Sequence, residues 1–252
     1  DLQKKGLAYE SDGALVVDIA QEGDAKEYPP CIVRKSDGAA LYATSDLATI
    51  IEREQDFHPD RYIYVVDKRQ ELHFIQVFRV AKKAGIVKED TPMIFLGFGT
   101  MNGKDGGPFK TREGGVMRLE HLIKNIDEKV YEKIQEKQKV PADEMTRTAE
   151  IVGLAALKYA DLSNQATKDY IFDVDRFISF EGNTGPYILY TIVRIKSILA
   201  KYKELRGADA KVVPIRPAES ETEKALQMAL CRFGEVTESA FYETAPHKLC
   251  QY

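Results

Sequence analysis

The sequence predicts an α/β fold for the first part of the chain, followed by an all-α part. Three observations lead to this prediction. Apolar, β-branched runs alternate with amphipathic segments up to residue 97, a glycine-rich stretch follows the last run, and helical periodicity dominates from residue 118 onward. Such alternation is typical of a parallel sheet with right-handed crossovers, which binds ligands outside the carboxyl ends of its strands.

Short β-prone runs open the chain. Residues 15–19 form the first predicted strand, within a β insertion. Residues 31–33 and 39–43 flank an Asp-Gly pair, which predicts a hairpin with a tight turn. The second arm of this hairpin leads into a helix that begins near residues 44–45, which are good N-caps, and ends before Pro59.

Two further strands and one helix follow in order. Residues 61–67 form an apolar and aromatic run, typical of a parallel strand covered on both faces. Residues 71–84 show helical spacing and stop at Gly85, and residues 92–97 form another apolar strand. The predicted order, counted from the 39–43 arm, is strand, helix, strand, helix, strand and loop.

The glycine-rich loop at residues 97–115 contains seven glycines among nineteen residues, together with Lys104, Lys110 and Arg112. Glycine lets backbone N–H groups approach a ligand closely, and the cations add positive charge beside those donors. This combination suits a polyphosphate, although an ordinary surface loop is the alternative.

Polar residues that follow each predicted parallel strand are expected to face one crevice. Tyr42 and Asp46 follow the first strand, residues 67–70 the second and residues 99–115 the third. Tyr42 and Asp46 suit an amine or guanidinium, whereas its position alone favours Asp46 as a first-turn acid stabilised by the helix dipole. Gln70 offers an amide to a carboxylate or ammonium, and its alternative role is capping or solvent contact.

Composition limits the kind of protein. The chain has 252 residues, 44% of them hydrophobic, which is enough for two domains, and its net charge of -4 argues against a generally basic nucleic-acid coat, so we expect no DNA partner. Its three cysteines lack a CxxC spacing and are expected to be reduced thiols. Four scattered histidines and no long apolar run predict no protein-held metal, no membrane contact and a cytoplasmic location. His73, on the helix after residue 70, is by default a satisfied core or boundary histidine.

The motifs now assembled resemble those of class I arginyl-tRNA synthetases, in order, spacing and identity. The similarity extends over essentially the whole chain and rests on five segments: residues 41–46 (LYATSD), 67–73 (DKRQELH), 103–115 (GKDGGPFKTREGG), 158–163 (KYADLS) and 180–187 (FEGNTGPY). The resemblance implies a Rossmann-like parallel-sheet catalytic domain, of which this chain holds the second half. It also implies a helical junction and an anticodon-binding helical bundle.

The resemblance assigns roles to individual residues. It implies that Tyr42 and Asp46 hold the guanidinium of L-arginine and that Gln70 binds the amino-acid end. Lysine should be rejected, because its ammonium is a point charge and not a planar two-donor group. The remaining assignments concern ATP with Mg²⁺, near which the resemblance places His73, Gly99, Met101, Lys110 and Arg112.

The loop departs from the general KMSKS pattern of class I synthetases. With Phe109 in the methionine place, Pro108 and Thr111 replace the two lysines. The catalytic residues implied by the resemblance are then Lys110, Thr111 and Arg112.

The part after residue 117 is predicted to be helical. Helices are expected at residues 118–139 and 142–163 and from Pro186 to about residue 205, with an extended link at 170–173 and further helices over 218–252. The buried face of the helix from Pro186 is expected to comprise Ile188, Ile192, Ile195 and Leu199.

Residues 194–216 carry seven Lys or Arg and two Asp or Glu. A solvated helix face is one explanation. The resemblance favours contact with the phosphates of tRNA(Arg) through Arg194, Lys196, Lys201 and Lys203.

We therefore expect three parts: a catalytic part at residues 1–117, with its signature loop at 97–115, a helical junction at 118–180 and a partial anticodon-binding domain at 181–252. The implied activity is that of an arginine-tRNA ligase. No His-x-Gly-His motif occurs in the sequence, so we expect negligible aminoacylation by this segment alone. The alternative is a non-catalytic tRNA-binding protein with a degenerate synthetase core, whereas a P-loop hydrolase is disfavoured because no GxxxxGK[ST] motif is present.

Overall fold

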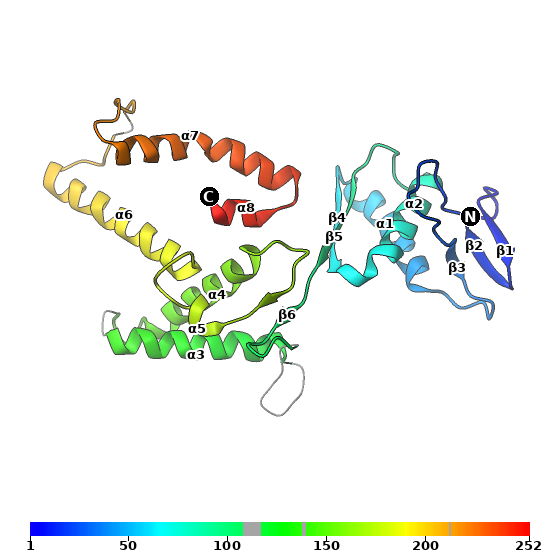
Figure 1. The fold of residues 1–252 in the computed structure, drawn as a ribbon, viewed down its shortest axis with the longest axis horizontal. Coiled ribbons are helices and arrows are strands. Elements are labelled where there is room, and N and C mark those ends of the chain that lie inside the picture. The colour runs from blue at the N-terminus through cyan, green and yellow to red at the C-terminus, as the bar shows by residue number, and fades with distance from the viewer. Residues whose placement is uncertain (108–116, 138–139, 212) are drawn as a thin grey trace. The chain divides into compact units, whose positions relative to one another are not determined.

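The computed structural model describes residues 1–107, 117–137, 140–211 and 213–252. By its internal contacts the chain divides into two compact units, an N-terminal unit (Asp1–Gly99) and a C-terminal unit (Thr100–Tyr252). Figure 1 shows that β-strands and helices mix in the N-terminal unit and that helices dominate the C-terminal unit. The predicted α/β fold with a following helical part is thereby confirmed, whereas the three-part division at residues 117 and 180 stays a prediction.

The N-terminal unit begins with a three-stranded antiparallel sheet. Its strands are β1 (Ala8–Ser11), β2 (Ala14–Val17) and β3 (Cys31–Arg34), in that spatial order. The turn between β1 and β2 is formed by Asp12 and Gly13, both with positive φ, at 49° and 77°. Two positive φ angles in an Asp-Gly pair are typical of a type I′ hairpin, so this dipeptide was a signal for the unpredicted strand β1.

The predicted second arm of the next hairpin is wrong. Residues 39–41 form no strand, and α1 (Tyr42–Phe57) begins directly after them. The backbone N–H of Leu41 donates to Oγ1 of Thr44 at 3.1 Å, and this hydroxyl donates to the carbonyl of Val33 at 2.7 Å. The segment therefore caps the helix and ties it to β3, whose ladder partner is β2.

The parallel pair follows as predicted. It consists of β4 (Tyr62–Asp67) and β5 (Met93–Phe98), joined through the 3₁₀ turn η1 (Lys68–Gln70) and helix α2 (Glu71–Lys83). The register runs from Tyr62 beside Met93 to Asp67 beside Phe98. Gly97 is required here, because a Cβ at this position would lie 2.9 Å from Cα of Lys68 in η1.

The expectation that this strand is covered on both faces is wrong for the described residues. Ile63 and Val65 of β4 are 44% and 59% exposed, whereas Tyr62 is 4% exposed. Parallel strands are usually covered on both sides, and β5 is the one partner strand of β4 in the described chain. The face of β4 that carries Ile63 and Val65 is therefore partly open among the described residues.

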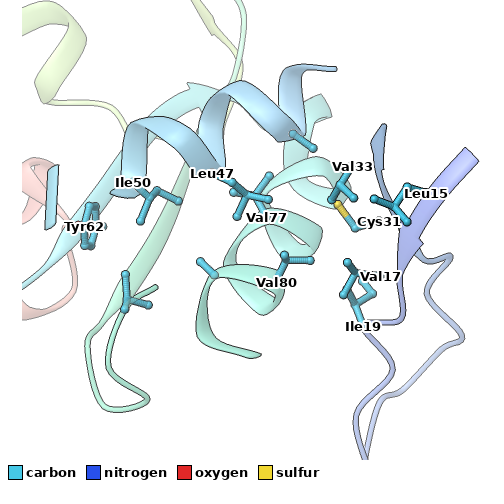
Figure 2. Packing of buried hydrophobic residues seen from close by; sticks show 13 residues of the cluster. Leu15, Val17, Ile19, Cys31, Val33, Leu47, Ile50, Tyr62, Val77 and Val80 are labelled. Carbon is cyan, nitrogen blue, oxygen red and sulfur yellow. The ribbon is translucent and has the colours of Figure 1, made fainter. Parts of the chain in front are cut away.

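The core of the N-terminal unit lies between α1, α2 and the antiparallel sheet (Figure 2). Leu47 and Ile50 of α1 meet Val77 and Val80 of α2 within one buried cluster. Full burial of each such side chain contributes about 1.5–3 kcal/mol. Cys31 belongs to the same cluster, and burial raises the pKa of its thiol to about 11, so it packs as an unreactive apolar side chain.

The segment between β2 and β3 is fastened to α2 by Arg79. The guanidinium donates to both oxygens of Asp24, at 2.6 and 2.7 Å, and to the carbonyl of Ile19 at 2.9 Å. It also lies 4.7 Å from the ring centre of Tyr28. The hydrogen bonds from Arg79 hold the pKa of the Asp24 carboxyl at about 2.

The C-terminal unit begins with a helical pair. α3 (Leu119–Lys137) and α4 (Met145–Leu162) confirm the two predicted helices, and residues 138–139 lie outside the described chain. The two helices pack through a buried cluster that also contains Phe172 and Ile178. The short elements beside them are β6 (Met101–Asn102), β7 (Tyr170–Ile171) and α5 (Val174–Phe177), and β6 pairs with β7 in parallel.

The unit ends with α6 (Gly185–Arg206), α7 (Glu221–Tyr242) and α8 (Pro246–Gln251). Thr184 caps α6 by accepting from the N–H of Tyr187, and Pro186 occupies its first turn as predicted. The Tyr159 hydroxyl of α4 lies within hydrogen-bonding distance of Oδ1 of Asn183 and, at 2.8 Å, of the carbonyl oxygen of Cys250. Residues of the 158–163 and 180–187 motifs therefore join α4 to the start of α6 and to α8.

The predicted buried face of α6 is wrong. The four residues assigned to it are 41–53% exposed: Ile188, Ile192, Ile195 and Leu199. The buried residues of α6 are Gly185 and Pro186, where the helix meets α4. Leu189 still packs against the core of the C-terminal unit, whereas every described residue of α6 from 190 to 206 is exposed.

Candidate functional site

The centre of the candidate site is a carboxylate and imidazole pair from two helices. Asp46 lies in the second turn of α1 and His73 in the first turn of α2. Their side chains meet at 2.6 Å between Oδ2 and Nε2 and are 31% and 26% exposed. Both helices are fixed from below by the buried cluster shown in Figure 2, so the core determines the spacing of the pair.

Aromatic side chains of β4 and α2 pack beside this pair. Tyr64 of β4 packs against Phe74 of α2, with ring centres 4.9 Å apart, and its hydroxyl accepts from Arg53 at 3.2 Å. Burial, and to a lesser degree the Asp46 carboxylate, raise the pKa of the Tyr64 phenol, while Arg53 opposes the shift. Phe74 in turn meets the ring of His73, with ring centres 5.0 Å apart, so the aromatic side chains extend to the pair.

Tyr42 is the first residue of α1, one turn before Asp46, and is 86% exposed. Residues four apart in a helix lie on the same face. The exposed ring and the partly exposed carboxylate therefore present an aromatic face and a negative charge on one side of α1. A cation is the chemical partner that this combination fits.

The end of β4 is organised by Asp67. Its carboxylate accepts from the backbone N–H of Arg69 at 2.9 Å and from the Arg69 guanidinium at 2.6 and 2.8 Å. These bonds hold the pKa of Asp67 at about 2. Gln70 follows, exposed, directly before α2. Because Asp67 pairs with Phe98, the turn after β4 and the start of the glycine-rich stretch lie side by side, as predicted for parallel strands.

The other residues predicted to bind ATP lie in different parts of the chain. Gly99 ends the N-terminal unit, whereas Met101 lies in β6 and packs against the core of the C-terminal unit. Lys110, Thr111 and Arg112 lie outside the described residues, so their roles stay predictions.

Lys104 at the root of the loop is already paired. Its Nζ lies 3.0 Å from Asp173 and 3.6 Å from Asp175, and Asp175 also binds Lys129 of α3 at 2.8 Å. These carboxylates raise the pKa of Lys104. The loop root is thus attached to α3 and α5.

The predicted tRNA-contact residues lie on α6, where all four are exposed: Arg194, Lys196, Lys201 and Lys203. Lys203 forms an ion pair with Asp209 at 3.1 Å. Within residues 1–107, 117–137, 140–211 and 213–252, no group of three or more His, Cys, Asp or Glu side chains is arranged to hold a metal ion. No helix among these residues is sufficiently long and apolar to cross a membrane.

Comparison with known families gives two matches. Residues 1–174 match the family described as tRNA synthetases class I (R), catalytic domain, and residues 188–252 match the DALR anticodon binding domain. The chain belongs to the family of class I tRNA synthetases (R). This finding confirms the resemblance inferred from the motifs.

Curated relatives in this family are similar along the whole chain. The arginine–tRNA ligase of Agathobacter rectalis is 58% identical over 259 residues, which cover 100% of this chain and 43% of that protein. The arginine–tRNA ligase of Alkaliphilus oremlandii is 57% identical and is covered over 42% of its length. The chain therefore spans less than half the length of these relatives.

Solved structures of the family share the fold. The crystal structure of arginyl-tRNA synthetase from Plasmodium falciparum aligns with a TM-score of 0.79 and 24% identity, covering 100% of this chain and 42% of that one. The Thermus thermophilus arginyl-tRNA synthetase aligns with a TM-score of 0.76 and 22% identity, covering 46% of that chain. At these identities the likeness supports the fold alone.

Sequence reasoning about this family member missed the pairing of Asp46 with His73 and the involvement of Tyr64. The two paired residues are separated by 27 positions. No local spacing connects them. The available signal was their common location near the N-terminal ends of successive helices of an α/β fold, near the edge where ligands bind.

Proposed function

We propose that this chain is part of an arginine–tRNA ligase that joins L-arginine to tRNA(Arg) at the expense of ATP. The observation that carries the proposal is the consecutive match to a class I (R) catalytic domain and an anticodon-binding domain. Two curated relatives with 58% and 57% identity over the whole chain bear the name arginine–tRNA ligase. We place the domain boundaries after residues 117 and 180, and the enzyme in the cytoplasm.

Arginine recognition is proposed for the α1 face. The Asp46 carboxylate, 31% exposed, accepts two parallel N–H groups of the substrate guanidinium, and the Tyr42 ring borders that cation. Gln70 binds the amino-acid end. A lysine substrate offers an ammonium without the planar pair of donors, so it gains less from this carboxylate.

Activation proceeds at the α-phosphate of ATP, which is bound with Mg²⁺ as a substrate complex. A carboxylate oxygen of arginine attacks this phosphorus, the bond to the bridging oxygen breaks, and pyrophosphate leaves. Lys110 and Arg112, beside Thr111 in the loop, offset the charge that develops on the phosphates. Gly99 and Met101 lie toward the nucleotide in this scheme, whereas His73, which was predicted with them, is paired with Asp46.

Transfer to tRNA completes the reaction. A hydroxyl of the terminal ribose attacks the arginyl carbonyl and AMP leaves. The exposed cations of α6 contact tRNA phosphates, a sequence-independent attraction that weakens with salt.

The test replaces Asp46 in the full-length enzyme. Asp46→Ala is expected to raise the KM for arginine by about ten- to a hundredfold, because hydrogen bonds to a charged group contribute about 1.5–3 kcal/mol. The KM for ATP should change little. Glu52→Ala removes an exposed carboxylate from the same helix and serves as the matched control. An unchanged KM for arginine in Asp46→Ala removes this residue from the pocket.

The isolated 252-residue chain is the negative reference in that assay. It lacks a His-x-Gly-His motif, and we expect negligible aminoacylation from it. Robust arginylation by this chain alone contradicts that expectation.

A further inference from the structure

The contact between Asp46 and His73 assigns a further residue to arginine recognition. We propose that His73 is a positioning residue, whose imidazole fixes the orientation of the Asp46 carboxylate for two-point binding of a guanidinium. This inference rests on the proposed role of Asp46. It extends that role to a second helix and replaces the expectation that His73 binds ATP.

The geometry of the contact is tight and its supports are rigid. Nε2 of His73 lies 2.6 Å from Oδ2 of Asp46, and neither side chain is more than a third exposed. Leu47 and Val77, buried neighbours on the two helices, are 5% and 0% exposed and belong to one cluster. The pair is therefore held by helices and not by loops, which favours a fixed geometry.

The imidazole itself is restrained by an aromatic neighbour. The ring of Phe74 meets the His73 ring edge-on, with centres 5.0 Å apart and an angle of 83° between the planes. Phe74 is 4% exposed. Since Phe74 is fixed in the interior, it limits the rotation of the imidazole and so directs Nε2 at Asp46.

A carboxylate has room for both partners. Its two oxygens offer about four acceptor positions, and His73 occupies one of them, at Oδ2. Among the described residues, the Asp46 side chain has no other hydrogen-bond partner. The remaining positions suit the parallel donors of a guanidinium, which require the carboxylate plane to be set correctly.

Fixing that plane in advance improves binding of the planar substrate in particular. A free Asp side chain must be ordered when arginine binds, and His73 removes part of this entropic cost. An ammonium is a point charge, so its binding depends little on the orientation of the carboxylate plane. The expected signature is thus an effect on arginine that leaves ATP unaffected.

The experiment uses the full-length enzyme and initial rates of tRNA arginylation at varied arginine and ATP. His73→Leu, which removes the donor, should raise the KM for arginine about tenfold and leave the KM for ATP unchanged. His73→Gln, which keeps an N–H donor of similar reach, should restore most of the loss. His121→Leu removes an exposed imidazole from α3 and is the matched control.

A double substitution distinguishes a failure of this inference from a failure of the proposed function. In an Asp46→Asn background, His73→Leu should add no further increase in the KM for arginine. If Asp46→Asn itself leaves this KM unchanged, the proposed function of Asp46 is wrong. If Asp46→Asn raises it while His73→Leu leaves it unchanged, or raises the KM for ATP instead, the positioning role alone is overturned.

Discussion

Gly185, the first residue of α6, permits the close crossing of α6 over α4. A Cβ at this position would lie 2.4 Å from the carbonyl oxygen of Ala155 and 2.7 Å from its carbonyl carbon. Both atoms belong to the backbone, so the helices must separate by more than half an ångström in Gly185→Ala. Overpacking of this kind costs about 1–3 kcal/mol.

Gly234 provides the matched substitution. It lies within α7, and apart from its chain neighbours and the adjacent backbone of its own helix, no heavy atom of the described chain lies within 4 Å of the point that a Cβ would occupy there. Gly234→Ala should therefore stabilise the chain by about 0.5–1 kcal/mol, because alanine loses less backbone entropy in a helix. The same substitution of alanine for glycine is thus expected to lower the stability of the chain at residue 185 and to raise it at residue 234.

The assay is urea unfolding of the 252-residue chain followed by far-ultraviolet circular dichroism, since the chain contains no tryptophan. With a urea dependence of roughly 2 kcal/mol per molar, the midpoint of Gly185→Ala should fall by about 0.5–1.5 M. Gly234→Ala should shift it slightly upward. A midpoint of Gly185→Ala equal to or above that of the unsubstituted chain refutes the reasoning about the crossing.

Two further outcomes are expected. The lowered pKa of Asp24, about 2 against an ordinary 3.8, means that its contribution to stability is present above about pH 4 and is lost as the pH falls toward 2. Arg79→Met should flatten the dependence of unfolding free energy on pH in this window, and an unchanged slope would count against the pairing. Phe172, 2% exposed and 5.0 Å from the ring centre of Phe177, fills the core of the C-terminal unit. Phe172→Ala should cost about 3–5 kcal/mol in the same urea assay, and a loss below about 1 kcal/mol would contradict its place in that core.

Local patterns were sufficient for most elements. The apolar run of β4, the helical spacing of α2 and the glycine at residue 85 each depend on neighbours in sequence, so their positions were predictable. Gly97 was predicted only as the start of the loop, because the close approach of β5 to η1 that requires a glycine there involves a partner distant in sequence. Motif identity then supplied the family.

Features that depend on distant partners were not predictable. Residues 39–43 have a β-prone sequence. In the structure, however, β3 pairs with β2 and Leu41 caps α1, so residues 39–43 do not form the second arm of a hairpin. The apolar spacing of α6 predicts a buried face only if another element covers it. The Asp46–His73 contact arises from the packing of α1 against α2, which no spacing within either helix encodes.

The pairing of Lys104 also changes how charge is distributed in the proposed reaction. From the sequence, Lys104 was one of three cations available to a polyphosphate, but its ammonium is held between Asp173 and Asp175. A cation neutralised by two carboxylates contributes little attraction to a further anion. In the proposed mechanism the negative charge of the phosphates is therefore offset by Lys110 and Arg112 with Mg²⁺. Lys104 instead attaches the root of their loop to the helices of the C-terminal unit.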